Sequence, residues 1–418
     1  MDRLPTHVYM DRWRAHLMAE LYRLQKSLGE TPSVEFPYTP PSSSRHPLPI
    51  RSCKREPRST AAWAVMPPNI RVAVFGATGR SASSIIDALH ESPETFEITA
   101  FSRSCSFQKP QNALHRSRGI HVLPYDLTRP NQDALVSVLR NIDVVVSALG
   151  PDAILDQIPL ARASRAAGVE RFVPAMYAPC APAVGVLDAR ELKEEVLNHV
   201  KRIGLGYTVI DVGCWYEHYT SGLPRLGAAT AAQQLPLPGL NVIPGTGDVL
   251  GALTSFRDVG RWVARVIADP RTLNKMVFAC GDVLTANQAF DIVDRVAGVH
   301  VSRNYFSGED LLAAISEARA LMRNGVAVES TARELRLAQS MYSYGVRGDN
   351  TPWTAKYLGY LNAAELYPDF RPVSFEEFVK DAVAGEGPMP CDYVGTARAN
   401  VLMKEMNEWT PRHIRTND

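Results

Sequence analysis

Two glycines in the segment FGATGRSA, Gly76 and Gly79, follow an apolar run at a spacing suited to holding phosphate groups. Gly76 allows a tight turn out of a strand, and Gly79 lets the backbone approach a pyrophosphate without a Cβ in the way. Ala82 stands where a third glycine is common, and that position needs only a small residue where helix and strand pack closely. The predicted cofactor-binding residues of this loop are Gly76, Ala77, Thr78, Gly79, Arg80, Ser81 and Ala82.

A second apolar run ends in ITAFSR and supplies cations where an acidic residue is usual in NAD-selective proteins. Arg103 ends this run, and Lys109 follows shortly after it. A guanidinium pairs bidentately with a 2′-phosphate, whereas a carboxylate would repel it. Arg103 and Lys109 therefore favour NADPH over NADH, and the alternative is a solvated surface arginine.

One lysine, Lys193, lies on the apolar side of an expected helix. It shares its helical stripe with Val196, Leu197 and Val200, so it lies near the centre of that face. Burying an ammonium is costly, so this lysine needs a carboxylate, a cofactor or a catalytic task. A buried ion pair or a lysine that reaches the edge of the face are the structural alternatives. The Tyr-x-x-x-Lys pair of short-chain dehydrogenases is absent, because Ala189 stands four residues before Lys193.

The elements that must position these residues alternate regularly. Apolar strands are expected at 71–75, 97–102, 121–125, 143–148, 171–174 and 207–212. Helices are expected at 81–90, 131–139, 154–167 and 188–203. Strands that alternate with helices of this length imply right-handed crossovers, so the predicted class is α/β, a doubly wound parallel sheet of the Rossmann type.

The chain divides into three parts by composition and pattern. Residues 1–68 are proline-rich and are expected to be a disordered or appended extension with one short helix. Residues 69–213 form the predicted NAD(P)-binding domain. Residues 214–418 are expected to form mainly a smaller C-terminal substrate lobe, with parts that return to the sheet. Its helix starts carry three capping-box patterns, Thr285 with Gln288, Ser307 with Asp310 and Ser374 with Glu377.

Bulk properties limit the classes of partner. The 45 basic and 44 acidic residues give a net charge of +1, which predicts neither a nucleic-acid nor a membrane partner. The six cysteines are scattered, a spacing typical of reduced thiols and not of a metal site. No apolar stretch is long enough to span a membrane, and no secretory signal is visible. We therefore expect a cytoplasmic protein with a small-molecule substrate and no metal; homodimer formation is left open.

The chain resembles the NmrA-like and isoflavone-reductase-like group of atypical short-chain dehydrogenases, particularly its fungal members. The similar segments include VFGATGRSA, DVVVSALG, ARASRAAGVERFVP, KEEVLNHVKRIGLGYTVIDVG, FRDVGRWVARVIADPRTLNKMVFACGD and AELYPDF, and they cover roughly residues 70–383. In reductases of this group the proposed acid–base group is a lysine eleven residues before a GI-x-YT segment. Lys193 precedes Gly204 by eleven. The resemblance therefore implies that Lys193 is catalytic and that Arg103 binds the NADPH phosphate.

Two segments depart from the pattern of this group on the substrate side. The usual PSEFG is PAMYA here, so Tyr177 adds a hydroxyl donor near the expected site. The segment CWYEHY supplies Trp215, Tyr216 and His218 at the expected mouth of the site, which suits an aromatic substrate. His218 is the second acid–base candidate; ordinary core aromatics and a structural histidine are the alternatives.

These features predict an NADPH-dependent reductase of a small aromatic or polyketide-like metabolite, with Lys193 as the acid–base group. One alternative is a non-catalytic NmrA-type regulator that senses dinucleotide and acts through a protein partner. That branch typically lacks the catalytic lysine, so Lys193 favours the enzyme. The other alternative is an isomerase or an epoxide-opening enzyme on the same scaffold.

Overall fold

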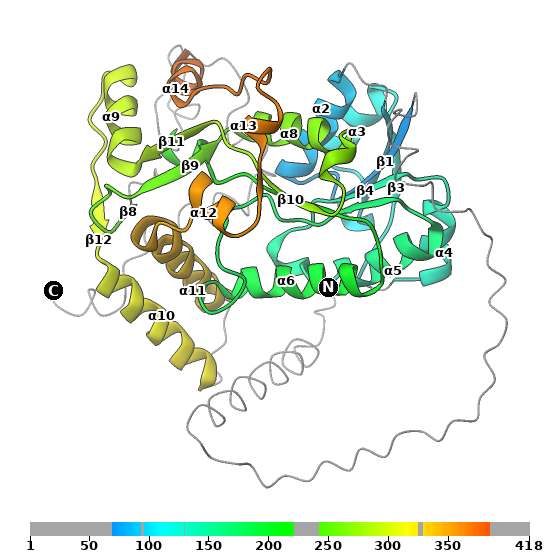
Figure 1. Ribbon diagram of the computed structural model, residues 1–418, viewed down its shortest axis with the longest axis horizontal. Coiled ribbons are helices and arrows are strands. Elements are labelled where there is room, and N and C mark those ends of the chain that lie inside the picture. Colours follow the sequence, from blue (N-terminus) through cyan, green and yellow to red (C-terminus); the bar gives the residue numbers. More distant parts are fainter. Residues whose placement is uncertain (1–68, 93–95, 129, 221–241, 325–328, 385–418) are drawn as a thin grey trace, which may run out of the picture. The chain divides into compact units, whose positions relative to one another are not determined.

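A parallel sheet of five short strands forms the first half of the described structure, toward the right in Figure 1. The computed structural model describes residues 69–92, 96–128, 130–220, 242–324 and 329–384, and the extension predicted at 1–68 lies outside them. The strand order is β3-β2-β1-β4-β5, and all neighbours are parallel. Its strands are β1 (Ile70–Phe75), β2 (Phe96–Ser102), β3 (His121–Pro124), β4 (Val144–Ser147) and β5 (Arg171–Val173).

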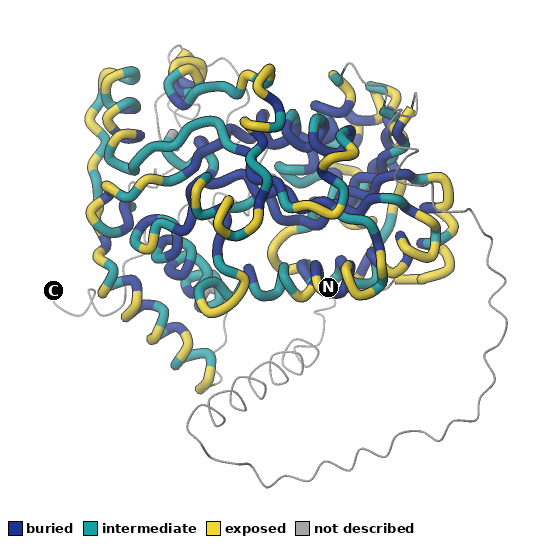
Figure 2. Tube along the Cα trace, in the orientation of Figure 1, coloured by how far each residue is buried: buried dark blue, intermediate teal, exposed yellow. Residues whose placement is uncertain are grey.

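Helices cover both faces of this sheet because its strands are apolar on both sides. In β1, Val72 and Val74 pack into one core with helices α2 and α8, while Ala73 and Phe75 pack into a second core with α5 and α6. Figure 2 shows the middle of this sheet as buried. The helices are α2 (Arg80–Glu91), α3 (Pro110–Ser117), α4 (Gln132–Leu139), α5 (Gln157–Ala167), α6 (Asp188–Arg202) and α8 (Phe256–Ile267). The predicted α/β class, a doubly wound sheet of the Rossmann type, is confirmed.

The sheet continues into the second half of the chain. Three further parallel strands follow β5, namely β6 (Thr208–Asp211), β10 (Lys275–Phe278) and β13 (Leu361–Asn362). They join the five-stranded sheet at Phe172, whose N–H donates to Gly206 O at 2.8 Å. Residues after 213 therefore supply β10, which pairs with β6, and β13, which pairs with β10.

Helix α8 also returns to the first half and packs against α2. The approach is closest at Gly260, where a Cβ would overlap the carbonyl group of Ser84. Gly260 N–H donates to Ser84 Oγ at 2.9 Å, and the same hydroxyl donates to Phe256 O. Only glycine fits this crossing, so α8 is part of the layer that supports the glycine loop.

The remaining elements form small sheets and helices. Strands β11 (Asp282–Thr285), β9 (Leu250–Thr254) and β7 (Cys214–Trp215) form one sheet, and β12 (Asn304–Phe306) pairs with β8 (Val242–Pro244). The helices are α7 (Glu217–Thr220), α9 (Ala286–Ala297), α10 (Gly308–Arg323), α11 (Glu329–Met341), the π-helix Tyr342–Arg347, α12 (Pro352–Tyr357), α13 (Ala363–Leu366) and α14 (Phe375–Ala384). Among the described residues, no helix combines the length and apolarity needed to cross a membrane.

Local signals placed the helix starts well. All three predicted capping boxes are present, with reciprocal bonds for the pairs that begin α9, α10 and α14. Helix α3 was not predicted, and α5, predicted from residue 154, begins at Gln157. A 3₁₀ turn at Pro151–Ala153 precedes it, because proline fixes the first position of that turn.

Candidate active site

The loop after β1 is shaped by its own backbone. Gly76 has φ +94°, and a Cβ there would lie 2.7 Å from Ala148 O at the end of β4. The N–H groups of Gly76 and Ala77 donate to Phe101 O at 3.0 and 3.1 Å, and Gly79 N–H donates to Gly76 O at 2.8 Å. The loop is thus fixed between the carboxyl ends of β2 and β4, where a parallel α/β sheet binds ligands.

Helix α2 begins directly at this loop without a capping side chain. Gly79 is its N-cap, with extended backbone and no side-chain hydrogen bond. The first-turn N–H groups therefore have no partner within the helix and carry the positive end of its dipole. A helix start of this kind binds the phosphate groups of nucleotides. The glycine cradle and the uncapped helix start fit a dinucleotide.

One residue that supports the loop, His115 of α3, was not predicted from the sequence. Its ring is buried, and Nε2 lies 3.2 Å from Ala77 O. Burial lowers the pKa of His115, so the ring is neutral near pH 7 and bonds the carbonyl through its N–H. The signal was a histidine three residues after Asn112, which is also buried. Two polar residues on one buried helix face indicate polar partners in the core.

The predicted phosphate-binding cations lie where β2 ends. Arg103 follows this strand, and Lys109 is the N-cap of α3. Both side chains are exposed, and neither forms an ion pair with any other described residue. The hydroxyl of Ser102 is buried and has no hydrogen-bond partner in the structure. A free guanidinium beside an unpartnered hydroxyl fits a ribose 2′-phosphate.

Lys193 lies on α6, with its ammonium directed to the carboxyl end of the sheet. Nζ donates to Met176 O at 2.5 Å, three residues after β5 ends. Burial lowers the pKa of Lys193 to about 8, while the charge of Asp211 raises it and that of Arg190 lowers it further. Val196 is fully buried on the same face. Lys193 is half-buried and its ammonium has a carbonyl partner, and an amine with this pKa exchanges protons near neutral pH.

Tyr177 is turned into the core, contrary to its expected place on the substrate side. Its φ is +34°, uncommon for a non-glycine residue, and its N–H donates to Ile210 O at 3.0 Å. The ring belongs to the core cluster that includes Val74 and Val212, and its hydroxyl is buried without a partner. Burial raises the pKa of Tyr177 above its ordinary range. The strained backbone directs this side chain inward, so its hydroxyl does not face an open site.

Arg80, Trp215 and His218 are brought together around Phe256. The Arg80 guanidinium carbon lies 5.6 Å from the Trp215 ring centroid and 5.0 Å from that of Phe256. The rings of Trp215 and His218 are 5.5 Å apart. Burial, with a smaller contribution from Arg80, lowers the pKa of His218 to about 4. His218 is therefore neutral near pH 7, and these side chains join the cofactor loop to the β7–α7 segment.

Tyr216 does not lie at the mouth of the site, contrary to its expected role. It is fully buried, and its hydroxyl bonds Asp282 Oδ2 at 3.2 Å and Val373 O at 3.1 Å. Its ring packs edge-on against Phe375 at 5.1 Å. Successive side chains of an extended segment point to opposite faces, so Trp215 faces the cofactor loop while Tyr216 faces the lobe interior.

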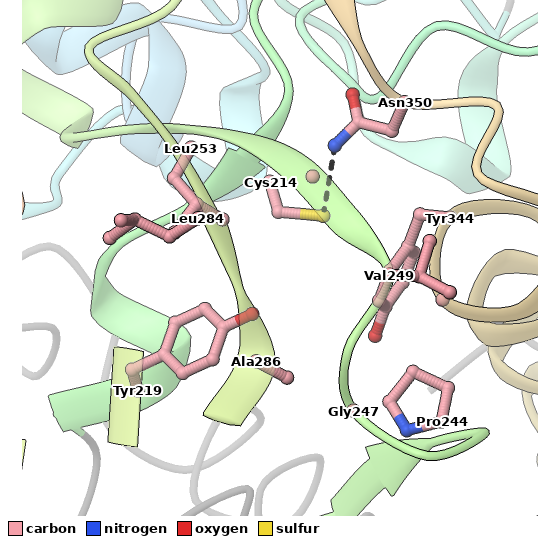
Figure 3. A pocket seen from close by; sticks show the side chains of 12 residues that line it. Cys214, Tyr219, Pro244, Gly247, Val249, Leu253, Leu284, Ala286, Tyr344 and Asn350 are labelled. Atoms are coloured by element: carbon pink, nitrogen blue, oxygen red, sulfur yellow. Dashed lines mark hydrogen bonds between the residues drawn. The ribbon is translucent and has the colours of Figure 1, made fainter. Parts of the chain in front are cut away.

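A small cavity lies beside Cys214 of β7 (Figure 3). The cavity is large enough for a buried water molecule. Tyr219 and Tyr344 line it, and Asn350 Nδ2 lies 3.7 Å from Cys214 Sγ. Burial raises the pKa of the Cys214 thiol to about 12. The lining contains none of the predicted site residues, so this cavity is separate from the Lys193 site.

Comparisons with known proteins agree with this geometry. The NmrA-like family model matches residues 68–379. The chain is 39% identical over 319 residues to asnovolin J 5′,6′-dehydrogenase of Aspergillus novofumigatus, covering 76% of this chain and 96% of that protein. It is 24% identical to eugenol synthase 2 of Clarkia breweri, covering 75% of this chain and 98% of that one.

Solved structures show the same fold. A crystal structure of isoflavone reductase superposes with a TM-score of 0.61 at 22% identity, covering 75% of this chain and all of that one. The binary complex of leucoanthocyanidin reductase with NADPH from Vitis vinifera gives 0.60 at 22% identity, covering 75% and 99%. The chain belongs to the NmrA-like family, in the isoflavone-reductase-like group of oxidoreductases that the sequence predicts.

Proposed function

We propose that this protein is an NADPH-dependent reductase of a small aromatic or polyketide-like metabolite, with Lys193 as its acid–base group. The observation that carries the proposal is the Lys193 ammonium, which bonds Met176 O at the carboxyl end of the parallel sheet. The relatives support the reaction class: one is named a dehydrogenase of asnovolin J, and a solved neighbour is a complex with NADPH.

The first half of the chain binds and orients the cofactor. The Gly76–Gly79 turn and the first-turn amides of α2 receive the pyrophosphate, and the dipole of this helix favours its charge. Arg103, with Lys109 nearby, holds the 2′-phosphate. When bound, NADPH supplies the hydride at its nicotinamide ring.

Lys193 manages the proton. Below a pKa of about 8 it is an ammonium, so it donates a proton to the substrate oxygen or carbon, directly or through a water molecule. In the oxidative direction the neutral amine accepts that proton. Burial keeps the pKa close to the working pH, where a group is efficient in both roles.

The substrate side is formed by aromatic and neutral groups. Trp215 lies beside Arg80 of the cofactor loop, and His218 adds an uncharged imidazole. Aromatic faces at this place favour a flat, largely apolar molecule. Because His218 is neutral near pH 7, it acts as a hydrogen-bond donor or acceptor to such a substrate, with Lys193 as the proton source.

The test compares Lys193→Ala with Lys201→Ala, a change of an exposed lysine on the same helix. NADPH oxidation is measured with a panel of aromatic ketones and enones, and NADPH affinity is measured by fluorescence titration. We expect Lys193→Ala to lower turnover by about 10²–10⁴-fold with little change in NADPH affinity, and Lys201→Ala to match the parent.

Two outcomes would contradict the proposal. Parent turnover in Lys193→Ala would remove this residue from the mechanism. A parent protein that binds NADPH, reduces none of the panel and binds a protein partner in a dinucleotide-dependent way would favour the dinucleotide-sensing regulator.

A further inference from the structure

A closed hydrogen-bonded ring of three side chains lies next to Lys193. Asp211 ends β6, and its buried Oδ2 accepts hydrogen bonds from Arg190 Nη1 and from the Tyr360 hydroxyl, both at 2.6 Å. Arg190 Nη2 donates to the Tyr360 oxygen at 2.7 Å. Each of the three groups thus bonds the other two, and together they are called the Asp211 network.

The Asp211 network reaches the residues around Lys193 by two routes. Arg190 stands one turn before Lys193 on α6, and its Nε donates to Glu194 Oε1 at 2.8 Å. Ala178 N–H lies 3.4 Å from Asp211 Oδ1, while Met176 O accepts from Lys193. The 176–178 loop is therefore held on one side by the ammonium and on the other by the carboxylate.

Stability alone is a weak reason to keep this arrangement. Arg190, Asp211 and Tyr360 are each less than 5% exposed, so both charges are removed from water. A buried ion pair of this kind is often no more stable than apolar residues of the same volume. Buried polar networks that are fully satisfied instead fix one arrangement of the groups around them.

The network also sets the charge around the ammonium. Among the described residues, the charged groups that act on Lys193 are Asp211 from β6 and Arg190 from its own helix. Burial and the Asp211 charge raise the pKa of Tyr360, so its phenol stays protonated and donates to the carboxylate. Two hydrogen-bond donors, the cationic Arg190 and the neutral Tyr360, therefore reduce the effect of the Asp211 charge on Lys193.

We propose that Arg190, Asp211 and Tyr360 are positioning residues for proton transfer, which fix the Lys193 ammonium and the 176–178 loop against the substrate. This inference rests on the proposed role of Lys193. Tyr360 follows α12 in the second half of the chain, 149 residues from Asp211 and 170 from Arg190. The lobe thus contributes to proton transfer through this hydroxyl without touching the substrate.

The test uses Tyr360→Phe, which removes one hydroxyl and keeps the ring. The matched control is Tyr367→Phe, because the Tyr367 hydroxyl donates to Asp269 Oδ2 at 2.8 Å, away from Lys193. For each variant, kcat and KM are measured across pH, together with NADPH affinity and Tm. The holoprotein with NADPH and an accepted ketone is used throughout.

We expect Tyr360→Phe to lower kcat by about tenfold while KM and NADPH affinity stay near parent values. Without the hydroxyl, one hydrogen bond to the Asp211 carboxylate is lost, so its negative charge should raise the pKa of Lys193 more strongly. The alkaline limb of the kcat profile should therefore move up by about half a pH unit. Tyr367→Phe should lower Tm to a similar extent and leave kcat and the limb unchanged.

A second variant, Asp211→Asn, should move the limb in the opposite direction, because it removes the negative charge that favours the ammonium. If this variant fails to fold, as loss of the buried Arg190–Asp211 ion pair would explain, the Tyr360→Phe result decides alone. A Tyr360→Phe protein with parent kcat and an unchanged limb overturns the positioning proposal. If Lys193→Ala itself keeps parent turnover, the proposed function fails first and this inference falls with it.

Discussion

The glycine loop after β1 and the β7–α7 segment lie on the two sides of Arg80, but they are held in different ways. Main-chain bonds to Phe101 O and the φ of Gly76 fix the loop. Side-chain packing fixes β7–α7, with Trp215 against Phe256 at 4.4 Å and Tyr216 in the lobe interior. A site formed by the backbone can be predicted from glycines and their spacing. A site formed by packed side chains cannot, because the position of each side chain depends on the elements it packs against.

The difference also concerns how each region fails. A substitution in the loop alters the backbone that receives phosphate, so cofactor binding should suffer directly. A substitution in β7–α7 alters one face of a short strand, and the two faces serve different purposes. The expected effect of a substitution on function is therefore largest at Gly76 in the loop and smallest at Tyr216 after β7.

The largest effect is expected for Gly76→Ala. The new Cβ would lie 2.7 Å from Ala148 O at a φ of +94°, so the loop must move. NADPH affinity, measured by fluorescence titration, should fall by about 100-fold or more. Gly150→Ala is the control, because a Cβ there meets nothing within 4 Å, and it should bind NADPH like the parent. Equal affinity of both variants would mean that the loop does not receive the cofactor.

Arg103→Ala should have the next largest effect, and only on one cofactor. Losing a charged hydrogen bond to the 2′-phosphate should weaken NADPH binding by about 1.5–3 kcal/mol and leave NADH binding unchanged. Arg140→Ala, a change of another exposed arginine in the first half, should affect neither. Titration with both cofactors is the measurement, and equal losses for the two would identify a structural arginine.

The pH dependence should follow Lys193, whose pKa is lowered from 10.5 to about 8. Reductive turnover should fall about tenfold per pH unit above pH 8, because the ammonium loses its proton, and oxidative turnover should fall below pH 8. The unfolded chain binds the extra proton up to pH 10.5, so this residue makes stability rise between pH 8 and 10.5. Rate profiles in both directions and Tm across pH are the measurements. A flat reductive profile from pH 7 to 10 would contradict the assignment.

The smallest effect is expected for Tyr216→Phe, between β7 and α7, whose side chain faces the lobe interior. It removes the hydroxyl that bonds Asp282 and Val373, at a cost of about 1 kcal/mol in stability. Turnover should stay within about twofold of the parent, because this side chain does not reach the cofactor loop. His218→Gln, in α7 beside Trp215, should instead lower turnover with little loss of Tm. A loss of turnover in Tyr216→Phe with parent turnover in His218→Gln would mean that Tyr216, and not His218, faces the substrate.

Much of the fold followed from the sequence, because its signals are local. Strand and helix periods placed the six strands up to β6 and helices α2, α4, α5 and α6 within a few residues, but they did not predict α3. The capping pair of Thr285 and Gln288 marked α9 correctly. The glycine loop was readable for the same reason. The side toward which Tyr216 points was not readable, because the two-residue strand β7 that precedes it has no periodicity of its own.

By itself, then, the sequence determined the strand–helix order, the glycine turn at Gly76 and the burial of the Lys193 face, since each depends on neighbours within a few residues. The tertiary structure decided the partners: His115 on the carbonyl of Ala77, and Tyr360 on Asp211 and Arg190. These partners are 38 to 170 residues apart in the chain. No local pattern encodes such pairs, because they form only when packing of the whole core brings distant elements together.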